Sequence, residues 1–107
     1  MGNALINVPG TVKRGEAFEI KALISHPMET GFRAGTNGTL IPRNIIQRFT
    51  CTYNGVEVFN LVLSPAIAAN PFIAFFTVAT ESGKLVLRWT GDDGFSAEET
   101  APITVTS

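Results

Sequence analysis

Strict alternation of apolar and other side chains is the feature that most constrains this chain, because only an extended strand places every second side chain on one face. In residues 16–24, the positions Phe18, Ile20, Ala22 and Ile24 fall on one face, and a glutamate and a lysine fall on the other. Residues 44–54 alternate in the same way. Gly, Pro, Asn or Asp interrupt such segments about every ten residues, and helix signals are poor, which predicts an all-β sandwich.

The strands expected from this pattern are residues 3–8, 16–24, 44–54, 56–63, 71–80, 84–91 and 95–105. Asn54-Gly55 fits a two-residue type I′ turn, whose central residues both need positive φ, and it would join two of these strands as a hairpin. Asp93-Gly94 predicts a second turn of the same kind. With 107 residues, we expect one domain that covers residues 1–107.

Residues 56–63 and 71–80 break the alternation, because both faces of each segment are apolar. A two-layer sandwich buries only one face of each sheet. The second apolar face is therefore covered either by the long loops of the same chain or by another subunit, and both explanations stay open here. As candidates for an outward, partner-facing side we take Phe59, Leu61, Ile73 and Phe75.

Charge and hydropathy exclude several classes of function. The net charge is −1, which supports neither nucleic-acid binding nor attraction to a membrane surface. No segment approaches the ~20 apolar residues that span a bilayer. Charged residues make up only 16% of the chain, and this low share favours a partly apolar surface that binds a partner. The N-terminus lacks a basic region followed by an apolar run, so we expect no signal peptide of its own.

The sequence offers few residues that could form a catalytic or metal site. Cys51 and His26 are the only cysteine and the only histidine, and together they make a thiol-dependent enzyme the alternative to test. Cys51 lies in the middle of a predicted strand, however, where burial raises the pKa of a thiol and makes it inert. Structural zinc needs four such ligands, and a blue-copper site needs two histidines. We therefore expect no catalytic residues, no metal and no cofactor.

The segment 25–43 is a long loop, and such loops often carry function in compact domains. His26-Pro27 ends the preceding strand, Glu29 and Arg33 are spaced to form an ion pair, and a short hairpin closed at Asn37-Gly38 fits the centre. One interpretation is a rigid structural loop. The other is a recognition loop that presents His26, Met28 and Arg33 to a partner, with the methionine exposed.

Several spaced segments resemble one known family in register from about residue 5 to residue 105. They are LISHPMETG (23–31), IPRNII (41–46), YNGVEVF (53–59), SPAIAANPFIAFF (64–76) and ATESGKLVLRWTGDDG (79–94). These segments are similar to those of SoxZ, the smaller subunit of the SoxYZ sulfur-carrier protein.

The resemblance implies an immunoglobulin-like β-sandwich without catalysis of its own, in a tight heterodimer with SoxY. SoxY carries sulfur intermediates on a cysteine of a glycine-rich C-terminal arm. The complex meets a c-type cytochrome, a sulfate-releasing hydrolase and a sulfur dehydrogenase during oxidation of thiosulfate, sulfide or related compounds. It also implies a periplasmic location, reached with a SoxY-like partner that holds a twin-arginine (Tat) signal.

This chain ends in TAPITVTS, without glycine or cysteine, so it does not have the arm that a carrier cysteine needs. We therefore expect the non-catalytic subunit. Two alternatives stay open: a thiol-dependent sulfurtransferase that uses Cys51 and His26, and a free-standing immunoglobulin-like binding module.

Overall fold

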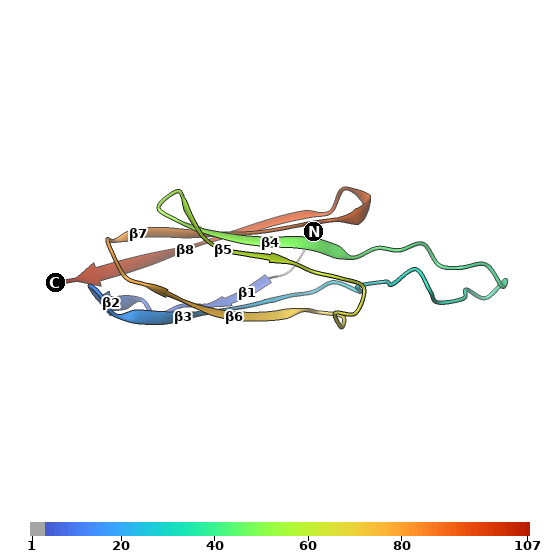
Figure 1. Cartoon of the computed structure of the whole chain (residues 1–107), viewed down its shortest axis with the longest axis horizontal. Helices are drawn as coiled ribbons and strands as arrows, with labels where there is room; N and C mark the ends of the chain where they lie inside the picture. Colours follow the sequence, from blue (N-terminus) through green and yellow to red (C-terminus); the bar gives the residue numbers. More distant parts are fainter. Residues whose placement is uncertain (1–3) are drawn as a thin grey trace.

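The computed structural model describes residues 4–107, and these residues form two β-sheets packed face to face (Figure 1). The three-stranded sheet has the order β1 (Ala4–Asn7), β3 (Ala17–Ile24), β6 (Phe72–Val78). The five-stranded sheet has the order β2 (Thr11–Lys13), β8 (Ser96–Thr106), β7 (Gly83–Gly91), β4 (Ile46–Tyr53), β5 (Val56–Val62). A single 3₁₀ turn, η1 (Asp92–Gly94), joins β7 to β8.

The all-β prediction is confirmed, and within residues 4–107 each predicted strand is present with its ends shifted by at most two residues. Residue 3, the expected start of the first strand, lies outside the described residues. An eighth strand, β2, was not predicted, because its three residues are too few to show an alternating pattern. It lies parallel to β8, whereas the other strand pairs are antiparallel. No helix in residues 4–107 has the length and apolar character needed to cross a membrane.

Both predicted turns adopt left-handed backbone. Asn54 has φ 49° and Gly55 has φ 83°, as a type I′ turn requires. The side chain of Asn54 folds over the β6–β7 connection: its Oδ1 accepts the Lys84 N–H at 3.0 Å, and its Nδ2 donates to the Ser82 carbonyl at 3.3 Å. Gly83 makes this approach possible, because a Cβ at that position would lie 1.8 Å from Asn54 Oδ1.

Aromatic side chains dominate the core between the sheets. The ring of Phe49 lies in its middle, with its centroid 5.0 Å from Trp89 and 5.9 Å from Phe75. Phe75 in turn stacks on Phe59 from β5, with the ring planes 8° apart. Since β5 and β6 are edge strands of different sheets, this stack joins the two sheets along one flank. Each fully buried aromatic or branched side chain contributes about 1.5–3 kcal/mol.

A long hairpin leaves one end of the sandwich and makes the molecule a rod of 61 × 20 × 19 Å (Figure 1). It comprises residues 29–44 and is held by isolated bridges between Glu29 and Asn44 and between Ala34 and Leu40. The tip closes where the Gly35 N–H donates to the Thr39 carbonyl at 2.6 Å. The short hairpin expected around Asn37-Gly38 is therefore present, as part of a longer one.

Candidate interaction surfaces

His26 lies at the base of the hairpin and is buried, with 4% of its surface exposed. Its Nδ1 accepts the Met28 N–H at 3.0 Å, and its ring packs edge-on against Phe95 with the centroids 4.7 Å apart. Asn70 holds its backbone from the other side through bonds of 2.9 and 2.8 Å. Because Nδ1 accepts, the neutral ring carries its proton on Nε2. Burial lowers the pKa of His26, and the Asp92 carboxylate offsets part of this effect.

Met28 is also buried, so the expectation that it is exposed for an adaptable contact is wrong. Its backbone turns left-handed at φ 50°, which is uncommon for a methionine. This turn directs the side chain inward, where Sδ accepts the Ile46 N–H at 3.2 Å. His26 and Met28 therefore anchor the hairpin and do not face a partner.

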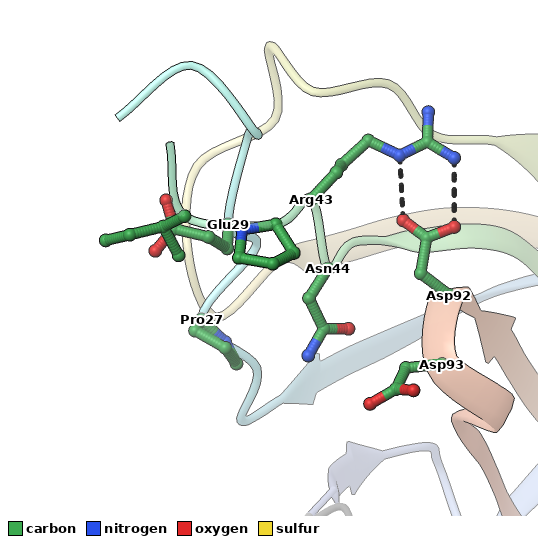
Figure 2. A pocket seen from close by; sticks show the side chains of 8 residues that line it. Pro27, Glu29, Arg43, Asn44, Asp92 and Asp93 are labelled. Carbon is green, nitrogen blue, oxygen red and sulfur yellow. Dashed lines mark hydrogen bonds and ion pairs between the residues drawn. The ribbon is translucent and has the colours of Figure 1, made fainter. Parts of the chain in front are cut away.

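A network around Asp92 fixes the second strand of the hairpin to the η1 turn (Figure 2). The guanidinium of Arg43 donates both Nε and an Nη to the carboxylate, at 2.8 and 2.9 Å, and the Ile45 N–H donates at 3.1 Å. Gln47 donates to the same carboxylate. The Arg43 bonds, followed by the backbone bond, lower the pKa of Asp92, so this side chain is ionised at neutral pH and does not act as a proton donor.

The same network borders a hollow of about 750 Å³, with Pro27, Glu29 and Arg43 among its walls (Figure 2). Glu29 is engaged with Arg33 at 2.7 Å, the ion pair that the sequence spacing predicts, and this bond lowers the pKa of Glu29. Within residues 4–107, no group of three or more His, Cys, Asp or Glu side chains is arranged to hold a metal ion. The ion pairs Glu29–Arg33 and Arg43–Asp92 at this hollow hold the base of the hairpin in place.

The exposed surface of the hairpin belongs to residues further along it. Phe32 is 81% exposed and Leu40 is 63% exposed, and the side chain of Arg33 is exposed beside them. Of the three residues predicted to form a recognition loop, only Arg33 is therefore accessible. Phe32 and Leu40 were missed, although two large apolar residues in a loop rich in Gly and Thr are a usable signal.

Strand β6 presents the opposite face to the one expected. Ile73 and Phe75 are each only 6% exposed and belong to the core, so their assignment to an outward side is wrong. The register explains it: Ile20 and Ala22, which are buried in β3, lie opposite Phe75 and Ile73. Phe59 and Leu61 are half-buried and pack against the core, and their place in a partner interface stays a prediction.

An outward apolar face exists nevertheless, and it spans the three-stranded sheet. Leu5 lies opposite Leu23, which lies opposite Phe72, so one apolar row crosses all three strands. Phe76 and Val78 extend it along β6, with 66% and 50% of their surfaces exposed. We name this row and extension the outer face of the β1–β3–β6 sheet. Large exposed apolar areas are a feature of interaction sites on protein surfaces.

The flank beside this face is also open. A groove of about 540 Å³ runs between the edge strands, lined by Val56 and Val58 of β5 and by Thr77 and Val78 of β6. Both strands end the order of their sheets, so each has an unpaired edge of N–H and C=O groups. The outer face therefore continues into an apolar groove between two unpaired strand edges.

Cys51 is buried as predicted, with no exposed surface. Desolvation raises the pKa of its thiol to about 11, so the reactive thiolate is almost absent at neutral pH. Its Sγ lies 3.8 Å from the Thr52 carbonyl, whereas the accepting nitrogen of His26 is already occupied by Met28. The two residues do not form an activated nucleophile.

Comparison with protein families gives one match that spans nearly the whole chain. Residues 6–102 match the family described as "Sulphur oxidation protein SoxZ". The chain belongs to the SoxZ family. The resemblance of the spaced sequence segments to this family is thereby confirmed. This SoxZ protein is a subunit of a sulfur-oxidation system. Among curated protein sequences, none matches it significantly.

Solved structures show the same fold at low sequence identity. A superoxide reductase (neelaredoxin) from Ignicoccus hospitalis superposes with a TM-score of 0.75 and 18% identity, over 96% of this chain and 80% of that one. The sulfur carrier protein SoxY from Chlorobium limicola f thiosulfatophilum gives 0.67 and 12%, over 97% and 79%. The CARDB domain of PF1109 from Pyrococcus furiosus gives 0.60 and 13%, over 98% and 94%. These likenesses confirm the immunoglobulin-like β-sandwich and concern the fold alone.

Proposed function

We propose that this SoxZ protein is the non-catalytic subunit of a heterodimeric sulfur carrier and holds a SoxY-like partner on the outer face of its β1–β3–β6 sheet. The observation that carries the proposal is the pairing of that exposed apolar face with an inert thiol. Since Cys51 is buried and the pKa of its thiol is about 11, the sulfur-bearing cysteine belongs to another chain.

The chemistry of the outer face fits a permanent partner. Phe72 and Phe76 are large, rigid and exposed, and aromatic residues supply much of the energy of protein interfaces. Glu19 and Lys21 lie on the same face and pair with each other at 3.7 Å, so a partner that covers this face would bury neither charge unpaired. An obligate interface of this kind typically buries ~2,000 Å² or more, and the groove between β5 and β6 extends the face toward that area.

Replacing one side chain of the outer face tests the proposal. Phe76→Asp places a charge on the outer face without entering the core, and we expect it to abolish stable association with the SoxY-like protein. Thr100→Asp, at an exposed position of β8 on the other sheet, is the matched control and should leave association intact. Sedimentation of the mixed subunits measures this. Unchanged assembly of Phe76→Asp would remove this face from the proposal.

The hairpin supplies a second surface, for transient contact with the c-type cytochrome, hydrolase or sulfur dehydrogenase that act on the carrier. Phe32 and Leu40 are exposed there with the Glu29–Arg33 ion pair beside them, an arrangement suited to weak, reversible contacts. Phe32→Ser should leave the heterodimer intact and lower the rate at which these enzymes use the charged carrier. An unchanged rate would exclude the hairpin.

The proposed location is the periplasm, reached together with a SoxY-like partner that carries the Tat signal. Support comes from membership of the SoxZ family and from the apolar outer face, which favours association before export. Cell fractionation with and without the partner gene tests it: we expect periplasmic protein only when the partner is present. Thiosulfate, sulfide or related compounds are the proposed sulfur sources.

The alternatives make different predictions. A sulfurtransferase would turn over a sulfur substrate without the partner and would lose that activity in Cys51→Ser. A free-standing binding module would be a stable monomer that ignores the SoxY-like protein. Mixing the purified chain with that protein separates both from the carrier subunit.

A further inference from the structure

Asn37 and Gly38 form the outermost turn of the hairpin, and their chemistry is independent of the carrier function. An asparagine followed by glycine is prone to deamidation, because glycine has no Cβ to block the approach of its own amide nitrogen to the side-chain carbon. The chain contains two such pairs, Asn37-Gly38 and Asn54-Gly55. The fold treats them in opposite ways.

At Asn37 the carboxamide oxygen receives two donors. The hydroxyl of Thr39 donates to Oδ1 at 2.7 Å, and the Thr39 N–H donates to the same oxygen at 3.3 Å. Donors aimed at an oxygen that gains negative charge during attack stabilise the transition state. The attacking nitrogen, that of Gly38, is held only by a 3.2 Å bond to the Gly35 carbonyl in an exposed turn.

At Asn54 the side chain is locked instead. Its carboxamide is bound at both ends, by Lys84 of β7 and by Ser82 of the β6–β7 connection. It lies directly over Gly83, where even a Cβ would come within 1.8 Å. Lys84 and Ser82 belong to another segment of the chain, whereas the Thr39 donors lie in the same turn as the reacting groups of Asn37. The two bonds of Asn54 therefore hold its carboxamide against that other segment, and turning it toward the nitrogen of Gly55 requires breaking both.

We propose that Asn37 is a built-in deamidation site, activated by Thr39, whereas Asn54 is protected by the fold. Hydroxide removes the proton from the Gly38 nitrogen, which attacks Asn37 Cγ. The bond from Cγ to the side-chain nitrogen breaks, and that nitrogen takes a proton from water and leaves as ammonia. Water then opens the resulting succinimide at either carbonyl, giving aspartate or isoaspartate, so asparagine and water become an acid and ammonia without redox change.

Peptide mapping by mass spectrometry tests the proposal on the full chain, incubated at mildly alkaline pH either folded or in guanidinium chloride. The denatured chain supplies each site's intrinsic rate, and the ratio of folded to denatured rate isolates the effect of the structure. The 2.7 Å bond from the Thr39 hydroxyl to the reacting oxygen makes Asn37 about fivefold faster when folded, and two bonds to break make Asn54 about thirtyfold slower.

Thr39 is a positioning residue, and its variants supply the decisive control. Thr39→Val removes the hydroxyl but keeps the branched shape, so the folded-state rate at Asn37 falls about fivefold while the denatured rate stays the same. Thr39→Ser keeps the donor and restores the wild-type rate. Protection of Asn37 in the folded chain, or equal folded rates in Thr39→Val and wild type, overturns the proposal. A folded rate at Asn54 as high as the rate at Asn37 does so as well.

Discussion

Phe75 and Phe76 are neighbours on β6 that point to opposite faces, so truncating each to alanine tests which face is core. Phe75 is buried, and its ring stacks on Phe59 with a centroid distance of 4.2 Å. Removal of a buried phenylalanine ring costs about 3–5 kcal/mol, and the lost aromatic pair places this site near 4 kcal/mol. Phe76 is mostly exposed, and its loss should change the free energy of unfolding by no more than about 0.5 kcal/mol.

Urea denaturation of the isolated chain measures both values. With an m-value of about 2 kcal/mol per molar, a loss of 4 kcal/mol lowers the midpoint by about 2 M. If Phe75→Ala leaves too little stability to fold, Phe75→Leu provides a smaller loss to compare with Phe76→Leu. Equal losses at the two positions, or a larger loss at Phe76, would refute the register described here, because a shift of one residue exchanges the two faces of a strand.

Three further predictions follow from single sites. Cys51, with a thiol pKa of about 11, should resist iodoacetamide at neutral pH in the folded chain and react once the chain is unfolded; rapid native labelling would contradict its burial. Because burial lowers the pKa of His26 from 6.5, the unfolded chain binds a proton that the folded chain does not, so stability is complete above that pH and falls as the pH drops below it. Urea midpoints on either side should show this slope, and His26→Asn should reduce it. Gly91→Ala places a Cβ 2.4 Å from the Ile45 carbonyl oxygen and should cost about 1–3 kcal/mol, whereas Gly10→Ala, which meets nothing within 4 Å, should leave the midpoint unchanged.

The strands could be predicted from the sequence because a period of two is a local signal. Residues 16–24 show it clearly, and β3 occupies almost the same span. The orientation of β6 could not be predicted in this way, since Phe72 and Phe76 on one face are as apolar as Ile73 and Phe75 on the other. Only the pairing with β3 decides which face is buried, and that pairing joins segments about fifty residues apart.

The loop 25–43 illustrates the same limit for the candidate site. Glu29 and Arg33 are close in the sequence, so their ion pair depends on local spacing and was predicted correctly. His26 is buried by Asn70 and Phe95, which come from distant segments. The left-handed turn at Met28 has no marker, because the residues that usually adopt it are glycine and asparagine.

The projecting hairpin has a hydrodynamic consequence. A compact domain of 107 residues has a radius of gyration of about 13 Å, whereas this chain has one of 16.3 Å. A single molecule therefore tumbles and elutes like a heavier globular protein, and gel filtration alone would mistake a monomer for a pair. Sedimentation equilibrium reports mass independently of shape, so it is the method that distinguishes the monomer from the proposed heterodimer.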